Sequence, residues 1–192
     1  MSFDKKYLPE LENLPEEMSI DQDGKGAIRQ WVCWKSVTNP KKGKADKVPI
    51  NVHTGGGAST TNPATWGTFW NALNFYRAWY GREHSHTGTG GKVLTGPISG
   101  LGFVLTPPWI GFDLDGCVEK GRIEPWAQEI IDMIGSYTEI SPSGTGIRIF
   151  AKGHLPPGRN RNGKIEVYQQ GRFLTVTGRV LPGMEAVKAY AQ

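Results

Sequence analysis

Cysteine is scarce in this sequence, and long apolar runs are absent from it. Only Cys33 and Cys117 occur in 192 residues, each within an apolar, strand-like stretch. This suits two buried reduced thiols better than a disulfide framework or a four-ligand zinc site. No apolar run reaches the length of about eighteen residues that spans a membrane, and residues 1–18 lack the pattern of a signal peptide. We therefore expect a cytoplasmic protein with no membrane partner.

The composition suits one compact domain with a modest basic excess. Hydrophobic residues make up 38% of the chain, and 22 Lys and Arg against 18 Asp and Glu give a net charge of +4, which permits nucleic-acid binding without requiring it. Basic side chains gather in two segments, Lys41, Lys42, Lys44 and Lys47 in one, and Arg159, Arg161 and Lys164 in the other. Two basic loops around an acidic centre suit a polyanion with bound metal, although each loop alone fits a solvated turn equally well.

Residues 1–27 are rich in Pro, Glu and Gly and predict an N-terminal arm before a folded domain at 28–192. Strand-like runs at 29–37 and 48–52 suggest a hairpin. A helix follows Asn62, with apolar residues at helical spacing: Trp66, Phe69, Trp70, Leu73, Tyr76 and Tyr80. We interpret this stripe as core, and a base-stacking platform is the alternative.

The glycine-rich segment 81–99 predicts a mobile loop without a nucleotide phosphate loop. In its GTGGK sequence, His86 stands where the first glycine of the phosphate-loop motif belongs, and Val93 replaces the hydroxyl residue that would hold magnesium. His84 and His86 have no third ligand nearby. We expect them to be solvated.

The second half of the chain predicts strands with one helix. Segments 100–105 and 109–118 suggest a β-hairpin, and a periodic helix with Pro125 near its start ends at Gly135. Further strand-like runs follow: 138–141, 147–153, 164–169 and 172–178. This order favours an α+β fold close to the split β-α-β arrangement.

Three carboxylates carry the predicted chemistry. Asp113 and Asp115 lie two apart on a predicted strand, so both would face the same side and could share divalent ions. A solvent-facing pair at a strand end is the alternative for these two residues. Glu166 lies between Ile165 and Val167 in another strand-like run, where it would add a third ligand. Because all three ligands are hard oxygens, Mg²⁺ or Mn²⁺ is favoured over zinc.

Phosphate donors surround these carboxylates in the sequence. A turn is predicted at Ser141, Ser143, Gly144 and Gly146, and Arg148 projects from the following strand. Arg172, Thr175 and Thr177 form a further donor set that could hold a triphosphate tail. Each donor taken alone is equally compatible with a structural role. Their combination with three carboxylates favours nucleotide binding.

Successive blocks of the sequence resemble the primase–polymerase branch of the archaeo-eukaryotic primase superfamily, found in phage and plasmid replication proteins. The blocks are WVCWK, KADKVP, GGGASTTNPATWGTF, GLGFVL, GFDLDGC, SPSGTGI and EVYQQGRFLTVTG, in that order over about residues 31–178. The resemblance implies a two-lobed fold with a catalytic sheet like that of the RNA-recognition motif. It also implies primer synthesis or extension on a single-stranded DNA template with NTPs or dNTPs.

The resemblance also implies roles for individual residues. Asp113 and Asp115 would form the first catalytic motif, residues 143–148 the second and Glu166 the third, with Arg172 near the phosphates of the incoming nucleotide. The four lysines between positions 41 and 47 would flank the nucleotide or template groove. Many relatives carry His where this chain has Arg148, which cannot exchange a proton near neutral pH. Relatives often continue into a helicase, which is therefore an expected partner as a domain or a separate protein.

Three other functions remain open from the sequence. A non-catalytic replication initiator would bind DNA in a salt-dependent way without needing metal. A metal-dependent nuclease also uses paired carboxylates, although the predicted phosphate donors fit a triphosphate better. A glycosyltransferase with a D-x-D motif is disfavoured by the basic loops.

Overall fold

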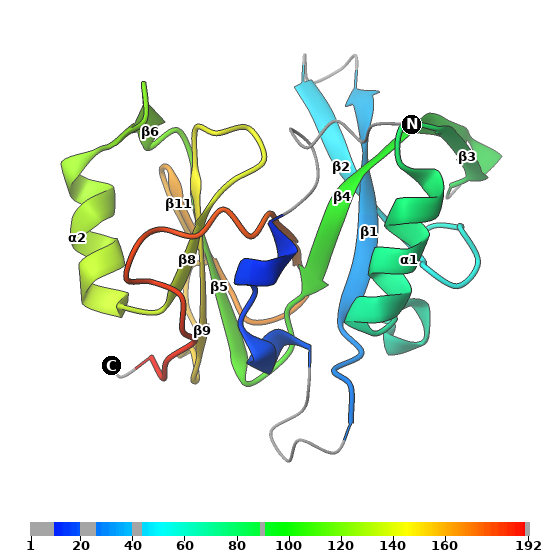
Figure 1. Cartoon of the computed structure of the whole chain (residues 1–192). Coiled ribbons are helices and arrows are strands. Elements are labelled where there is room, and N and C mark those ends of the chain that lie inside the picture. Colours follow the sequence, from blue (N-terminus) through cyan, green and yellow to red (C-terminus); the bar gives the residue numbers. More distant parts are fainter. Residues whose placement is uncertain (1–9, 20–25, 40–43, 89–90, 191–192) are drawn as a thin grey trace. The chain divides into compact units, whose positions relative to one another are not determined.

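The computed structural model describes residues 10–19, 26–39, 44–88 and 91–190. The chain forms two compact units (Figure 1), one made of Met18–Val104 and the other of Met1–Glu17 together with Leu105–Gln192. Strands predominate, with two α-helices among the described residues, which confirms the α+β class. No described helix is long and apolar enough to cross a membrane. The expected arm at 1–27 stays a prediction.

The Met18–Val104 unit is built on an antiparallel sheet. Its strands are β1 (Trp31–Asn39), β2 (Lys44–Ile50), β3 (Glu83–Thr87) and β4 (Val93–Val104), paired in the order β3-β4-β1-β2. The β1–β2 pairing confirms the hairpin expected there. A short 3-10 helix, η4 (Pro63–Thr65), precedes α1 (Phe69–Trp79), which starts at Thr68 in a capping box with Asn71.

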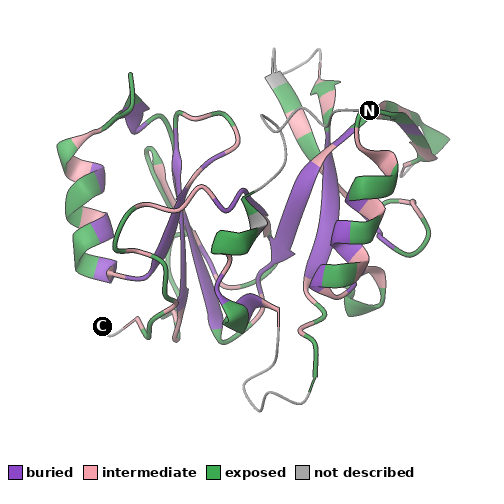
Figure 2. Cartoon of the chain, in the orientation of Figure 1, coloured by how far each residue is buried: buried purple, intermediate pink, exposed green. Residues whose placement is uncertain are grey.

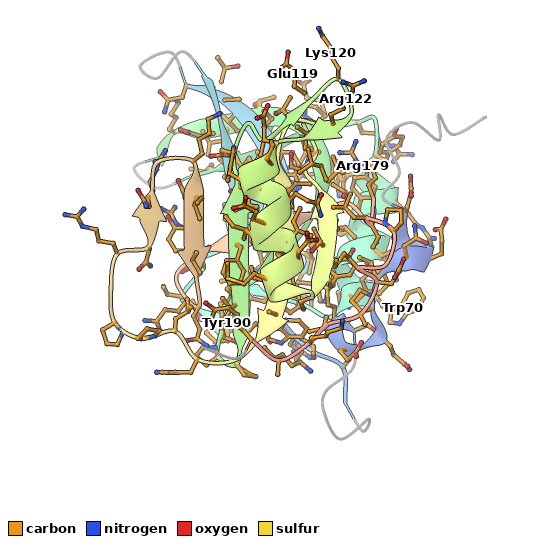
Figure 3. The ribbon with its side chains drawn as sticks, turned by 90° about the vertical axis from the view of Figure 1, so that its left-hand side faces the viewer. Trp70, Glu119, Lys120, Arg122, Arg179 and Tyr190 are labelled. Carbon is orange, nitrogen blue, oxygen red and sulfur yellow. The ribbon has the colours of Figure 1, made fainter. Side chains whose placement is uncertain are left out.

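Helix α1 packs an aromatic face onto this sheet. The Phe69 ring meets Trp31 edge to face at 5.2 Å, and Leu73 and Tyr76 are buried beside it. The predicted core stripe is therefore confirmed for most of its members, since Trp66 is buried as well. Trp70 is an exception, because 61% of it is exposed and it points away from the core (Figure 3). Tyr80 is only partly buried.

The expectation of a mobile loop in the glycine-rich segment 81–99 is wrong for the residues that the structure describes. Residues 83–87 form β3 and residues 93–99 belong to β4, and the two strands pair with Ser85 opposite Thr95. The cross-strand ladder supplies backbone partners that override the turn preference of the glycines. His84 is consequently buried against the ring of Trp79 at 4.8 Å, rather than solvated.

The unit that contains Leu105–Gln192 is built on a second antiparallel sheet. Its strands are β5 (Trp109–Leu114), β8 (Tyr137–Ile140), β9 (Ile147–Lys152), β10 (Arg161–Asn162) and β11 (Ile165–Tyr168), in the order β10-β11-β5-β9-β8. Also in this unit are a small hairpin of β6 (Val118–Glu119) and β7 (Arg122–Ile123), and strand β12 (Phe173–Val176). The short 3-10 helices η2 (Leu11–Asn13) and η3 (Glu16–Met18) lie near the N-terminus.

Strand β5 does not pair with the segment at 100–105, so the expected hairpin is wrong. β4 pairs with β1 in one unit, whereas β5 lies between β9 and β11 in the other. The two runs looked like a hairpin because both are apolar and only a short TPP segment separates them. Apolar runs of this kind identify strands without identifying their partners.

Helix α2 (Pro125–Ile134) covers one face of the second sheet. It ends at Gly135, which adopts a left-handed conformation with φ 57°, as the sequence predicts. Its buried side chains pack with alternate residues of the central strands, among them Ile110, Phe112, Leu114, Ile147 and Ile149. The central strands are mostly buried in Figure 2, and the outer side of α2 is exposed. The opposite face of β5 therefore carries the side chains of Trp109 and Asp113, with Gly111 between them.

Candidate active site on the second sheet

Five charged residues form one row across this sheet, on the face opposite α2. In the strand registers, Arg161 lies opposite Glu166, Glu166 opposite Asp113, Asp113 opposite Arg148, and Arg148 opposite Glu139. Residues that face each other in antiparallel strands project their side chains to the same side, so the whole row shares one face. The sheet thus brings Asp113 and Glu166 together as predicted, with Arg148 beside them.

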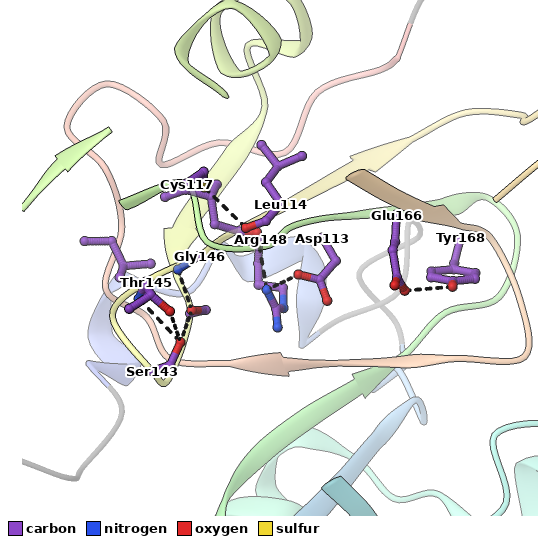
Figure 4. A network of polar contacts seen from close by, with 12 residues as sticks. Asp113, Leu114, Cys117, Ser143, Thr145, Gly146, Arg148, Glu166 and Tyr168 are labelled. Carbon is purple, nitrogen blue, oxygen red and sulfur yellow. Dashed lines mark hydrogen bonds and ion pairs between the residues drawn. The ribbon is translucent and has the colours of Figure 1, made fainter. Parts of the chain in front are cut away.

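Arg148 is the direct ionic partner of Asp113. Its Nη1 donates to Asp113 Oδ1 and also contacts the carbonyl oxygen of Ile147 at 3.3 Å (Figure 4). The Arg148 side chain is 5% exposed and that of Asp113 is 17% exposed. The Nε of Arg148 is buried without a hydrogen-bond partner. A largely desolvated guanidinium therefore holds one carboxylate oxygen and has a further donor that is unsatisfied.

Glu166 has its own set of partners. The hydroxyl of Tyr168 donates to Glu166 Oε2 at 2.8 Å, and Arg161 Nη1 lies 3.2 Å from Oε1. The Arg161 side chain is 65% exposed, so water screens this ion pair. Burial and the bond to Glu166 raise the pKa of Tyr168. The guanidinium of Arg172 lies over the Tyr168 ring at 4.9 Å, so the predicted phosphate-binding arginine is linked to Glu166 through this tyrosine.

Tyr168 was missed by the sequence analysis. Its spacing from Glu166 is i, i+2 on a strand, which places both side chains on one face and could have identified it. Arg161 was predicted only as part of a basic loop. The strand register shows that it belongs to the row of charges.

Asp115 lies just beyond the strand on which it was predicted. β5 ends at Leu114, and Asp115 begins an exposed turn while its N–H still donates to Lys164 O at 2.8 Å. Among the described residues, no group of three or more His, Cys, Asp or Glu could hold a metal ion as it stands. The carboxylate trio therefore remains a prediction, of which the facing pair Asp113 and Glu166 is observed.

The turn at 141–146 is compact and uses most of its own donors. The N–H of Gly144 donates to Ser141 O at 2.9 Å, and that of Gly146 donates to Ser141 Oγ at 3.1 Å. These two N–H groups were expected to contact phosphate, but they stabilise the turn instead. The exposed hydroxyls of Ser143 and Thr145, 2.9 Å apart, are the groups that the turn presents to solvent. Thr145 was not singled out from the sequence.

The turn packs against the end of β5. A Cβ added at Gly146 would lie 2.7 Å from Leu114 O, so only glycine fits there. Thr145 O accepts a hydrogen bond from Val118 N at 3.0 Å. Ser143 and Thr145 are thereby held beside the segment that carries Asp115.

Glu139 ends the row as a fully buried carboxylate. It accepts hydrogen bonds from the N–H of Thr177 and of Gly178 and from the hydroxyl of Tyr137, each at 2.9 Å. Burial raises its pKa to about 7, while these hydrogen bonds and nearby Arg148 oppose the rise. Thr177, predicted as a phosphate donor, therefore has a structural contact through its backbone.

The remaining predicted residues make none of the contacts described above or fall outside the described residues. Thr175 is inside β12, and its buried hydroxyl has no hydrogen-bond partner. Lys41 and Lys42 fall outside the described residues. Lys44 begins β2, and the exposed Lys47 places its Nζ 5.7 Å from the ring centre of Trp34. Both cysteines are buried and free, as expected.

Comparison with known proteins finds a relative for most of the chain. No family model matches the chain. The chain is 36% identical over 169 residues to the DNA primase-polymerase of Nitratiruptor phage NrS-1, and the match covers 83% of this chain and 20% of that protein. The chain therefore spans about a fifth of the length of the relative it matches. The resemblance to a primase–polymerase that the sequence blocks predict is confirmed over most of the chain.

Proposed function

Because most of its length is similar to part of a phage primase–polymerase, we propose that this chain is a nucleotidyltransferase domain acting on DNA. It joins NTPs or dNTPs to a primer, or starts one, on a single-stranded template. The observation that carries the proposal is the facing pair of carboxylates, Asp113 and Glu166, on neighbouring strands. Arg148, Arg172 and the hydroxyls of Ser143 and Thr145 supply phosphate donors around that pair.

The donor set suits a hard divalent cation. Asp113 and Glu166 place two carboxylates on one face, where they repel each other unless cations compensate, and here arginine side chains do so. Asp113, Glu166 and the neighbouring Asp115 would hold Mg²⁺ or Mn²⁺ through oxygen ligands. When bound, the metal would lower the pKa of the attacking 3′-hydroxyl and neutralise the triphosphate.

The chain's own residues would bind and orient the nucleotide. Arg148 and Arg172 carry permanent charges suited to phosphate oxygens, and Arg172 is kept near Glu166 by the Tyr168 ring. Ser143 and Thr145 add exposed hydroxyl donors on a turn fixed against β5. Tyr168 orients Glu166 through its hydroxyl. These contacts support positioning as the main contribution of the protein.

The finer features of the family follow as part of the proposal. A sheet with α2 on one face and the charged row on the other is compatible with a catalytic sheet like that of the RNA-recognition motif, in a two-lobed fold. Residues 28–192 would form the catalytic domain after an arm at 1–27. Lys41, Lys42, Lys44 and Lys47 would contact DNA. Because the relative is about five times longer than the match, a helicase is a reasonable partner for the catalytic domain.

One assay tests this function against its rivals. The domain is incubated with a labelled primer on a single-stranded template, with dNTPs or NTPs and with Mn²⁺ or Mg²⁺, and a parallel reaction omits the primer. We expect metal-dependent extension that is lost in Asp113→Asn. Shortening of the labelled primer in a reaction without nucleotides would indicate a nuclease. Salt-sensitive DNA binding without extension under any of these conditions would indicate a non-catalytic initiator.

A further inference from the structure

Arg148 holds the carboxylate that the proposed reaction needs for metal. It lies between Asp113 in β5 and Glu139 in β8, in the row described above. Its ion pair with Asp113 is largely shielded from water, since the two side chains are 5% and 17% exposed. A bound cation at Asp113 would therefore meet a permanent positive charge at hydrogen-bond distance from the same carboxylate.

We propose that Arg148 is the counterion of Asp113 when no nucleotide is bound, and that the triphosphate of the incoming nucleotide then replaces Asp113 as its partner. This inference rests on the proposed function. In the nucleotide-free protein, Arg148 forms an ion pair with Asp113 and weakens metal binding to this carboxylate. When phosphate oxygens bind the guanidinium, Asp113 is released to the metal. The metal and the nucleotide thereby favour each other's binding through one arginine.

The surroundings of Arg148 allow this exchange of partners. Its Nε is buried and has no hydrogen-bond partner, so the pairing with Asp113 leaves one donor of the guanidinium unsatisfied. Glu139 also acts on Arg148 electrostatically, although its own oxygens are engaged by Tyr137, Thr177 and Gly178. Glu139 would keep the arginine in the row after Asp113 releases it. Since binding linkage is reciprocal, the metal must improve nucleotide binding by the same factor.

Metal affinity without nucleotide is the first test, with Mn²⁺ binding followed by electron paramagnetic resonance of the free ion. Arg148→Gln should bind Mn²⁺ about tenfold more tightly than the wild type or better, because a charge beside a carboxylate changes its cation affinity by roughly one to three powers of ten. Arg148→Lys keeps the charge and should stay near the wild type.

Arg161→Gln is the matched control for the metal test. It removes the same charge from the same row, but Arg161 is 65% exposed and pairs with Glu166. Its effect should therefore be about threefold or less. Equal tightening in the Arg148 and Arg161 variants would reduce the effect to general electrostatics and overturn the proposal. So would unchanged Mn²⁺ affinity in folded Arg148→Gln.

The second test measures nucleotide binding without metal and does not depend on Arg148 variants folding. A deoxynucleoside triphosphate is titrated into the protein in excess chelator. Asp113→Asn and Glu166→Gln each remove one negative charge from the row, but only the first releases Arg148. Asp113→Asn should bind the triphosphate at least about fivefold more tightly than Glu166→Gln, since a charge-assisted bond becomes available. Equal affinities in the two variants would overturn the proposal.

The outcomes separate this inference from the proposed function. If the wild-type protein extends primers but binds Mn²⁺ no more weakly than Arg148→Gln, the proposed function stands and the counterion role is overturned. Absence of Mn²⁺ binding in every variant, with or without nucleotide, would overturn both. Tighter Mn²⁺ binding in Arg148→Gln that Asp113→Asn abolishes would support the exchange at Asp113.

Discussion

Tyr168 donates its hydroxyl hydrogen to Glu166 at 2.8 Å while its ring lies beneath the guanidinium of Arg172 at 4.9 Å. One side chain thus connects a predicted metal ligand with a predicted phosphate ligand. The hydroxyl and the ring can be removed separately, which allows the two connections to be tested apart.

Tyr168→Phe should mainly lower kcat. The variant loses the bond that orients Glu166 but keeps the ring under Arg172, so we expect kcat to fall about three- to tenfold, an effect of roughly 1 kcal/mol. The KM for nucleotide should change little. Tyr168→Leu removes the ring as well and should also raise KM. Primer extension with titrated dNTP measures both constants, and an unchanged kcat in Tyr168→Phe would show that Glu166 does not need this bond.

Glu166→Gln and Arg172→Ala should separate chemistry from binding. Glu166→Gln removes a charge that acts mainly in the transition state, so kcat should fall by orders of magnitude with a smaller effect on KM. Arg172→Ala should mostly raise KM, by about tenfold, because it loses a charge-assisted hydrogen bond. Single-nucleotide extension at saturating DNA and fixed Mn²⁺ gives both constants. Wild-type behaviour of Glu166→Gln would leave Asp113 and Asp115 as the predicted ligands, because Glu139 is buried with both oxygens hydrogen-bonded and Asp132 lies on α2, against the other face of the sheet.

Asp115 needs its own test because it follows β5 instead of lying within it. Asp115→Asn should abolish incorporation if the turn brings this carboxylate to a metal, and the fold should remain intact because the side chain is exposed. Thermal unfolding checks the fold. Metal with dNTP should raise the Tm of the wild type and do so far less in Asp115→Asn. A fully active variant would reduce the metal site to Asp113 and Glu166.

Glu139 should make stability depend on pH in an identifiable way. Its folded pKa of about 7 lies above the ordinary value of 4.5, so its stabilising contribution is complete below about pH 4.5 and is lost as pH rises through 7. The stability advantage of the wild type over Glu139→Gln should therefore narrow by about 3 kcal/mol between pH 4.5 and 8. Denaturant unfolding of both proteins across this range measures the difference. A gap that widens with pH would show that the three hydrogen bonds outweigh burial.

The turn beside β5 should tolerate one glycine substitution better than the other. Gly146→Ala would place a methyl group 2.7 Å from Leu114 O, so we expect the turn to shift and the KM for nucleotide to rise. Gly144→Ala is the control in the same turn. Its φ of 77° imposes strain of about 1–2 kcal/mol, but nothing lies within 4 Å of the added Cβ. Equal KM values in the two variants would indicate that the turn does not contact nucleotide.

Much of the second unit could be predicted from sequence because its patterns are local. The period of α2 with its Gly135 cap and the strand-like runs around Asp113 and Glu166 identify their elements directly. The pairing of strands could not be predicted in the same way, because it depends on contacts between distant segments. For this reason Arg148 was expected as a phosphate ligand, and its ion pair with Asp113 was not foreseen.

The segment at 81–99 also shows that strand pairing cannot be predicted from local sequence preferences. Its glycines predicted a loop, but a ladder with Ser85 opposite Thr95 makes it a pair of strands. The local conformational preference of these residues is weak, and pairing between the two strands determines the structure. The same segment lacks the phosphate-loop motif whatever its fold, because that motif requires particular residues at fixed positions.

The register between β11 and β5 has a consequence for how the domain can misfold. A slip of two residues keeps every apolar side chain on the α2 face, so burial alone does not oppose it. Such a slip would place Tyr168 or Lys164 opposite Asp113 in place of Glu166. This alternative alignment would bury the same apolar side chains but would not bring Asp113 and Glu166 opposite each other.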